Sequence, residues 1–188
     1  MKTIFFVTTN PNKLEEARKV LELSNLKIEP VILELPEVQH FSQEYVVTEK
    51  LKHAYKKLKK PVFVDDTGIY FSNYADFPGT MTKFVVNSLK LEGIMRLIDE
   101  GSKAFFRTLV GFTDGKKTII CEGKLEGQLT KKIPTNVNPI MPFSSIFVPF
   151  GEKQTLSQLG DEYLKHHSHR SIALVQLKER ILTNGKSE

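Results

Sequence analysis

The chain has 188 residues and a mass of 21.5 kDa, the size of one ordinary globular domain. Hydrophobic residues make up 40% and charged residues 26%, which supports a core and argues against intrinsic disorder. No apolar run approaches the roughly 20 residues of a membrane helix, and no signal peptide opens the chain. We therefore expect a single domain over residues 1–188 with no membrane association.

The cysteine content bears on the cellular compartment, and the distribution of charge bears on possible binding partners. Cys121 is the single cysteine, so an internal disulfide is excluded and a reducing cytoplasm is expected. The net charge is +5, and the surplus of lysine is concentrated between Lys50 and Lys60. Apolar residues recur there at helical spacing, which predicts an amphipathic helix with a solvated lysine face. A nucleic-acid surface is the less favoured interpretation, and nucleic acid is not an expected partner.

The hydrophobic pattern predicts strands alternating with helices in the first half of the chain. In order, we expect a strand over Thr3–Thr8, a helix capped by Asn10, a strand over Leu26–Leu35, a helix over Ser42–Lys60, a buried strand over Pro61–Val64, a polar loop over Asn73–Thr80 and a helix over Val85–Glu100.

The second half is expected to begin with a hairpin. Its strands, Ala104–Thr113 and Lys117–Gly127, are joined at Asp114-Gly115, which is a strong turn signal. Loops near residues 134–142, a strand over Ile146–Val148 and two helices follow, the last over Ser168–Leu182. This order predicts an α/β fold with a mixed sheet.

The first candidate site is the turn Thr8-Thr9-Asn10-Pro11-Asn12-Lys13, between a strand and a helix. A helix N-terminus favours anions, yet Lys13 stands where a capping box would place Glu or Gln. A cation there is unfavourable unless an anion such as phosphate binds between it and the free amides. The segment is either a phosphate site or an ordinary Asn10 cap beside a solvent-facing lysine.

The second candidate site is Asp65-Asp66-Thr67-Gly68, at the expected end of a buried strand. Neighbouring carboxylates repel each other unless a cation compensates them. Mg²⁺ is bound by one or two carboxylates together with substrate phosphates, so this pair suits it. The alternative is a simple turn, because Asp and Gly form turns readily.

Two further segments carry possible chemistry. Glu37 in Leu35-Pro36-Glu37 is, by itself, best interpreted as a surface acid. In Ser168-His169-Arg170, Ser168 is a natural helix cap and two cations follow it in the first turn. This repeats the anomaly at Lys13, and two such helix starts suggest one shared anionic ligand.

The order and spacing of these motifs resemble a known family. Thr8-x-Asn10-x-x-Lys13, Leu35-Pro36-Glu37, Asp65-Asp66-Thr67-Gly68, Phe77-Pro78-Gly79 and Ser168-His169-Arg170 are similar to the inosine triphosphate pyrophosphatase (Ham1-like) family, with Phe77–Gly93 closest to its eukaryotic and archaeal branch. The resemblance implies Mg²⁺-dependent hydrolysis of ITP, dITP and XTP to monophosphate and pyrophosphate, and a homodimer. It also implies an elongated two-lobed α/β fold, with a long mixed sheet and the active-site cleft between the lobes.

The resemblance further assigns roles to residues. The catalytic residues would be Asp66, Asp65 and Lys13, the metal ligands Glu37 and Asp66, and the substrate-binding residues Thr8, Thr9, Asn10, Lys13, Thr67, Phe143, Ser144, Lys165, Ser168, His169 and Arg170. Asp66 could be general base, metal ligand or both. His169 and Arg170 would recognise the 6-keto edge of the base.

The expected base-recognition segment departs from the family pattern. The family's arginine is replaced by Thr135, its aspartate by Ser144 and its lysine by Leu164, with Lys165 one position late. Phe143 keeps an aromatic ring that can stack on a purine. Weakened 6-keto selectivity is therefore expected, and two alternatives stay open: a non-catalytic nucleotide-binding relative and a basic RNA-binding module.

Overall fold

The computed structural model describes residues 2–22, 26–36, 38–133 and 142–183. The described strands form one mixed sheet in the order β2-β1-β3-β5-β6-β7, and β4 pairs with β3 off this path. The strands are β1 (Lys2–Val7), β2 (Leu26–Val31), β3 (Val62–Phe71), β4 (Phe77–Gly79), β5 (Lys103–Thr113), β6 (Thr118–Leu129) and β7 (Phe147–Pro149). β1 runs parallel to β2 and β3, whereas β3, β5, β6 and β7 pair antiparallel. The predicted α/β fold with a mixed sheet is confirmed.

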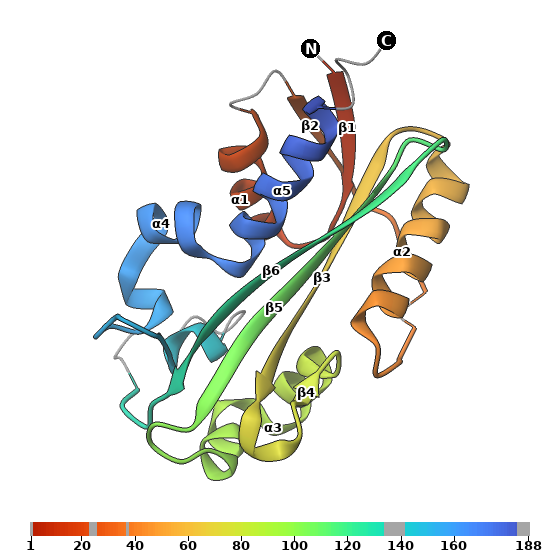
Figure 1. Ribbon diagram of the computed structural model, residues 1–188. Helices are drawn as coiled ribbons and strands as arrows, with labels where there is room; N and C mark the ends of the chain where they lie inside the picture. Colours follow the sequence, from red (N-terminus) through yellow and green to blue (C-terminus); the bar gives the residue numbers. More distant parts are fainter. Residues whose placement is uncertain (1, 23–25, 37, 134–141, 184–188) are drawn as a thin grey trace.

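Helices cover both faces of this sheet. They are α1 (Pro11–Leu21), α2 (Gln43–Leu58), α3 (Thr82–Leu97), α4 (Leu156–His167) and α5 (His169–Thr183), with 3₁₀ turns η2 (Ser72–Tyr74) and η3 (Pro142–Ser145). Figure 1 shows β3, β5 and β6 as long twisted strands, with α1 and α5 on one side and α2 on the other. None of the helices described is long and apolar enough to cross a bilayer.

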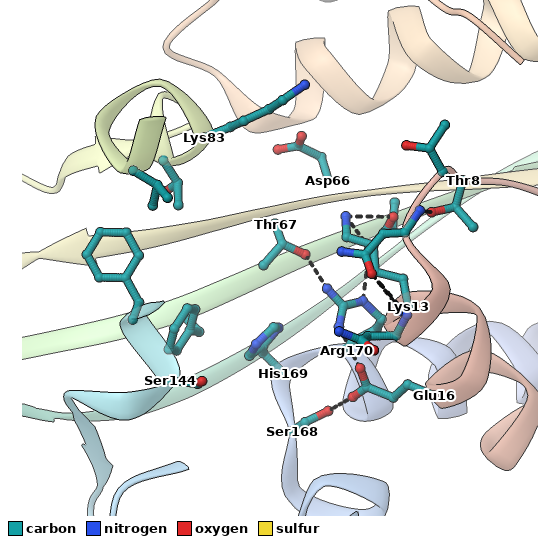
Figure 2. A pocket seen from close by; sticks show the side chains of 18 of the residues that line it. Thr8, Lys13, Glu16, Asp66, Thr67, Lys83, Ser144, Ser168, His169 and Arg170 are labelled. Carbon is teal, nitrogen blue, oxygen red and sulfur yellow. Dashed lines mark hydrogen bonds and ion pairs between the residues drawn. The ribbon is translucent and has the colours of Figure 1, made fainter. Parts of the chain in front are cut away.

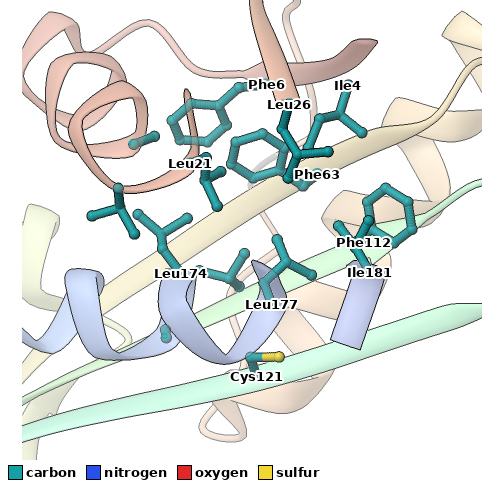
Figure 3. Packing of buried hydrophobic residues seen from close by; sticks show 14 of the residues in the cluster. Ile4, Phe6, Leu21, Leu26, Phe63, Phe112, Cys121, Leu174, Leu177 and Ile181 are labelled. Atoms are coloured by element: carbon teal, nitrogen blue, oxygen red, sulfur yellow. The ribbon is translucent and has the colours of Figure 1, made fainter. Parts of the chain in front are cut away.

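Separate hydrophobic clusters define two lobes along the long strands. Between the sheet and the α1–α5 layer lies the cluster of Figure 3, which includes Ile4, Phe6, Leu21, Phe63, Leu174 and Leu177. Under α2, Val47, Leu51 and Ala54 pack on Val62, Val64 and Leu109. At the other end of the strands, a cluster including Phe71, Ile94, Phe106, Phe143 and Phe147 joins α3, η3 and α4. The two-lobed architecture is therefore confirmed.

Local signals set several element ends as expected. The Asn10 side chain caps α1 by accepting from the backbone N–H groups of Asn12 and Lys13. In the hairpin, Asp114 Oδ1 accepts from the N–H groups of Lys116 and Lys117, both at 3.0 Å. These caps and turns depend on side chains close in sequence, which is why the sequence revealed them.

Other boundaries differ from the prediction. β3 does not end before Asp65 and Asp66 but continues to Phe71, because the whole segment pairs with β5. The expected loop over residues 73–80 contains β4, which adds to the same strand, and β2 ends at Val31 rather than Leu35. The acidic pair therefore lies within a strand and not at its end.

We expect Gly123→Ala to lower the free energy of unfolding by about 2 kcal/mol, the cost typical of overpacking. A Cβ at Gly123 of β6 would lie 1.8 Å from the carbonyl oxygen of His169, so the first turn of α5 would have to move away. Gly111→Ala in β5 is the matched control, because its Cβ would meet only side-chain carbons of Leu51 and Val47, at 3.3 Å. Urea unfolding measures the free energy of unfolding of both variants. Equal losses of stability in Gly123→Ala and Gly111→Ala would contradict this prediction.

Candidate active site

A cavity of about 1170 Å³ lies between the two lobes. The middle of β3 forms its floor, and α1, α2, α3, η3, α4 and α5 contribute to its walls. The sequence-predicted residues that line it are Thr8, Thr9, Asn10, Lys13, Asp65, Asp66, Thr67, Phe143, Ser144, Lys165, Ser168, His169 and Arg170. The predicted ligand Glu37 and the replaced position Thr135 fall outside the described residues.

Asp65 is a buried carboxylate that binds the cations of two helix starts. Its side chain is 2% exposed and accepts from Lys13 Nζ at 3.0 Å and from Arg170 Nε at 2.9 Å. Burial by itself would raise the pKa of Asp65, but Lys13, Arg170 and Lys50 outweigh burial and hold the pKa well below its ordinary value. The shared anion suggested by the two cationic helix starts is thus supplied, within the protein, by Asp65.

Arg170 is fixed by three partners on two elements, β3 and α1. Besides Asp65, its guanidinium donates from Nη1 to Glu16 on α1 and from Nη2 to Thr67 Oγ1 at 3.0 Å. Ser168 donates its hydroxyl to Glu16 and accepts from the Ser171 N–H at 2.9 Å, which caps α5 as predicted. Figure 2 shows this network along one wall of the cavity. Glu16 was not foreseen, because it is an ordinary helix acid in the sequence.

Asp66 faces the opposite side of the sheet from Asp65, because adjacent side chains of a strand alternate. Its Oδ2 accepts from Gln43 Nε2 at 3.1 Å, and the Gln43 carbonyl accepts from the Tyr70 hydroxyl at 2.9 Å. Burial raises the pKa of Asp66 above its ordinary value, while Lys50 and Lys13 partly counter this. The charge of Asp65 also contributes to the raised pKa of Asp66, so the expected repulsion between the two carboxylates is present, and Lys50 and Lys13 compensate part of it.

Two lysines join the Asp66 end of the cavity. Lys50 of α2 donates to the Asp65 backbone carbonyl at 2.8 Å, so its assignment to the solvated lysine face was wrong. Gln43, Val47 and Lys50 follow each other at helical spacing, and this period could have revealed the inward position of Lys50. Lys83 extends from α3 toward the same end of the cavity, as Figure 2 shows.

The other end of the cavity is aromatic and uncharged. His169 is 6% exposed, and its ring stacks on Phe106 with the centroids 4.9 Å apart. Burial holds the pKa of His169 well below its ordinary value, and Arg170 adds to this effect, so the ring is neutral at pH 7. Phe143 and Ser144 of η3 line the same end, where Phe143 packs edge-on against Phe71.

The altered positions on α4 also reach the cavity. Leu164 and Lys165 both line it, and Leu164 packs on the core of the α3–α4 lobe. The neighbouring histidines form no metal site with described residues. Nε2 of His166 lies 3.2 Å from Oε1 of Glu162, and the ring of Tyr163 contacts the ring of His167. Within the described ranges, no cluster of three or more His, Cys, Asp or Glu side chains could hold a metal without other ligands.

The fold and the cleft define an α/β protein with a long mixed sheet and a charged cavity between two lobes. Residues 4–180 match the sequence profile of the Ham1 family, and the chain belongs to this family.

Relatives share nearly the full length of the chain. A dITP/XTP pyrophosphatase from Saccharolobus solfataricus is 34% identical, with 92% of this chain and 90% of that protein covered. An inosine triphosphate pyrophosphatase from Schizosaccharomyces pombe is 32% identical, with 95% of each chain covered. The structure of a HAM1 protein from Coxiella burnetii has the same fold, with a TM-score of 0.82, 21% identity and coverage of 98% of this chain and 100% of that one.

We expect Asp65→Asn to lower the free energy of unfolding by about 3 kcal/mol, because the buried Arg170 and the partly buried Lys13 lose a charged partner. The pKa of Asp65 is depressed in the folded protein, so its contribution is complete above its ordinary pKa of about 4 and is lost as the pH falls below that value. Chemical denaturation at pH 7 and pH 3 should therefore show a smaller difference between native protein and variant at pH 3.

Glu29→Gln is the control for this prediction. Glu29 forms an exposed pair with Lys27 at 2.6 Å, which solvent and salt screen, so its loss should leave the unfolding midpoint unchanged. A loss for Asp65→Asn no larger than for Glu29→Gln would show that the buried pairs contribute nothing.

Proposed function

We propose that this chain hydrolyses non-standard purine nucleoside triphosphates, such as ITP, dITP and XTP, to the monophosphate and pyrophosphate. The observation that carries the proposal is the division of one cavity into a charged end, with Lys13, Lys50 and Asp66, and a neutral aromatic end, with His169 and Phe143. Such a cavity suits a ligand with a phosphate chain at one end and a flat base at the other. The names of the relatives support this substrate class.

The start of α1 binds the triphosphate in this proposal. Thr8 and Thr9 line the cavity beside the α1 cap, and Lys13 reaches into it while anchored to Asp65. A lysine held by a buried carboxylate keeps its position before substrate arrives, so little side-chain freedom is lost on binding. Lys50 and Lys83 supply further positive charge from the facing helices. Asp65 thus serves the reaction by holding Lys13 and Arg170 in place.

Asp66 is the general base of the proposed reaction. A water molecule attacks the α-phosphorus, Asp66 takes its proton, and the bond from the α-phosphorus to the bridging oxygen breaks to release pyrophosphate. Gln43 fixes one carboxylate oxygen of Asp66, which orients the other toward the cavity. The raised pKa of Asp66 makes it a stronger base than an exposed aspartate, which suits this task.

The donor set also fits Mg²⁺, which the family resemblance implies. Among the described residues lining the cavity, lysine and arginine side chains balance the carboxylates one for one, so the polyanionic triphosphate needs additional positive charge. When bound, Mg²⁺ neutralises the phosphate oxygens and favours the leaving group. Asp66 would hold it with substrate oxygens, and Glu37 is the proposed second carboxylate.

The neutral end of the cavity would recognise the base. His169 offers a hydrogen bond to the 6-keto oxygen, Phe143 and Phe106 offer aromatic surface, and Ser144 lies next to Phe143 on η3, while Lys165 lines the cavity from α4. Arg170 already donates from each of its nitrogens to the protein, so we assign it to positioning the wall on which the base lies. A cytoplasmic homodimer remains the expected form, and light scattering in solution tests the dimer.

The proposal is tested by incubating the protein with Mg²⁺ and ITP, XTP, dITP, GTP or ATP in separate reactions. Release of pyrophosphate together with monophosphate, fastest for the deaminated purines, is the expected result. Release of orthophosphate would indicate attack at the γ-phosphorus, and no turnover with any triphosphate would favour a nucleotide-binding relative without catalysis.

We expect Asp66→Asn to lower kcat by at least about 10²-fold, the lower end of the range for loss of a general base. The melting temperature should not fall, because burial disfavours the charge at this position. Gln176→Leu is a control, since Gln176 donates to the Glu122 carbonyl away from the cavity. Near-native turnover by Asp66→Asn, with pyrophosphate release and circular dichroism as readouts, would remove Asp66 from the mechanism.

A further inference from the structure

A chain of three hydrogen bonds links the Arg170 ion pairs to the ring of His169. Arg170 Nη2 lies 3.0 Å from Thr67 Oγ1, and Thr67 Oγ1 lies 2.8 Å from Thr108 Oγ1. Thr108 Oγ1 in turn lies 2.6 Å from His169 Nδ1. The two threonines face each other because Thr67 of β3 and Thr108 of β5 are direct partners in the ladder. Thr108 is fully buried, and the mechanism above does not use it.

The charged end of this chain favours one direction for its hydrogen bonds. Arg170 can only donate, so Thr67 Oγ1 accepts one hydrogen bond. In the described part of the protein, Thr67 Oγ1 has Arg170 and Thr108 as hydrogen-bond partners, and of these two only Thr108 can accept its hydrogen. Thr108 then accepts from Thr67 and gives its own hydrogen to His169 Nδ1. In this arrangement each threonine hydroxyl donates once and accepts once.

This direction determines which nitrogen of His169 carries the proton. A neutral imidazole has one donor and one acceptor nitrogen, and Nδ1 is the acceptor when Thr108 donates to it. The proton then resides on Nε2, the ring nitrogen that Thr108 does not contact, and His169 lines the cavity. We propose that Thr108 is a positioning residue that fixes the Nε2–H tautomer of His169, making His169 an obligate hydrogen-bond donor toward the base.

The Nε2–H tautomer of His169 favours 6-keto purines over adenine, an inference that rests on the proposed function. A 6-keto oxygen accepts a hydrogen bond from Nε2–H, whereas the 6-amino group of adenine presents a donor against a donor. Such a mismatch leaves buried polar groups unpaired, which is the strongest means of rejecting a base. Without the Thr108 hydroxyl, His169 can adopt the other tautomer and accept from adenine. Thr108 thereby supports selectivity although Ser144 and Leu164 replace polar groups of the family pattern.

Nitrogen-15 NMR of the imidazole tests the proposal without substrate, because protonated and unprotonated ring nitrogens have distinct chemical shifts. In the native protein, His169 should show a protonated Nε2 and an unprotonated Nδ1 at pH 7; a protonated Nδ1 would overturn the proposal. Assignment comes from the His169→Gln spectrum. This measurement stands even if no triphosphate is hydrolysed, so its failure and that of the proposed function are distinguishable.

Substitutions then test the link to selectivity. Thr108→Val keeps the shape and removes the hydroxyl, so the single Nε2–H form should be lost. The ratio of kcat/KM for ITP over ATP should fall about tenfold, the equivalent of one hydrogen bond. Thr108→Ser retains the hydroxyl and should restore both readouts; its spectrum and selectivity decide the matter if Thr108→Val does not fold.

Thr113→Val is the matched control on the same strand. It removes a buried threonine hydroxyl that donates to the Lys117 carbonyl in the hairpin turn, far along β5 from His169. It should leave the tautomer and the ITP/ATP ratio unchanged whatever it does to the melting temperature. Equal loss of selectivity in Thr108→Val and Thr113→Val, or an unchanged His169 spectrum in Thr108→Val, would overturn the proposal.

Discussion

The candidate active site depends on one buried carboxylate, that of Asp65. It accepts from Lys13 at the start of α1 and from Arg170 at the start of α5, which are 52 and 105 residues away in the sequence. A buried charge is tolerated only when it is paired and hydrogen-bonded, so each of these groups requires the others. Because both cations must meet the same carboxylate, two helices and the central strand converge at one wall of the cavity.

Because side chains alternate along a strand, the neighbouring acids Asp65 and Asp66 have different surroundings and different roles. Asp65 faces α1 and α5, where cations lower its pKa, whereas Asp66 faces α2, where burial raises its pKa and Gln43 holds it. Asp65 is therefore held in a structural ion pair, whereas Asp66, the next residue, lies at the cavity with a raised pKa. The same alternation brings Thr67 to the side of Asp65, where it continues the network from Arg170 to Thr108.

Residues that act through distant partners could not be found by motif. Glu16, Gln43 and Thr108 are common residue types within ordinary periodic segments, and no local pattern separates them from surface or core residues. Their roles arise from the pairing of β3 with β5 and from the packing of α1 and α2 against the sheet. Lys50 is the exception, because its helical spacing from Gln43 and Val47 could have shown that it lies on the inner face, although the lysine-rich pattern predicted the solvated face.

The sequence by itself determined the features that rest on near neighbours: the alternation of strands and helices, the Asn10 and Ser168 caps, the Asp114-Gly115 hairpin and the order of the motifs that resemble a family. Local hydrogen bonds and hydrophobic periodicity suffice for these, since both act over a few residues. Only the tertiary structure decided that β3 runs on through the acidic pair and that Asp65 and Asp66 serve opposite faces. It also decided that the anion shared by Lys13 and Arg170 belongs to the protein. Those outcomes follow from long-range strand pairing and burial, which determine what surrounds a charge and therefore what it can do.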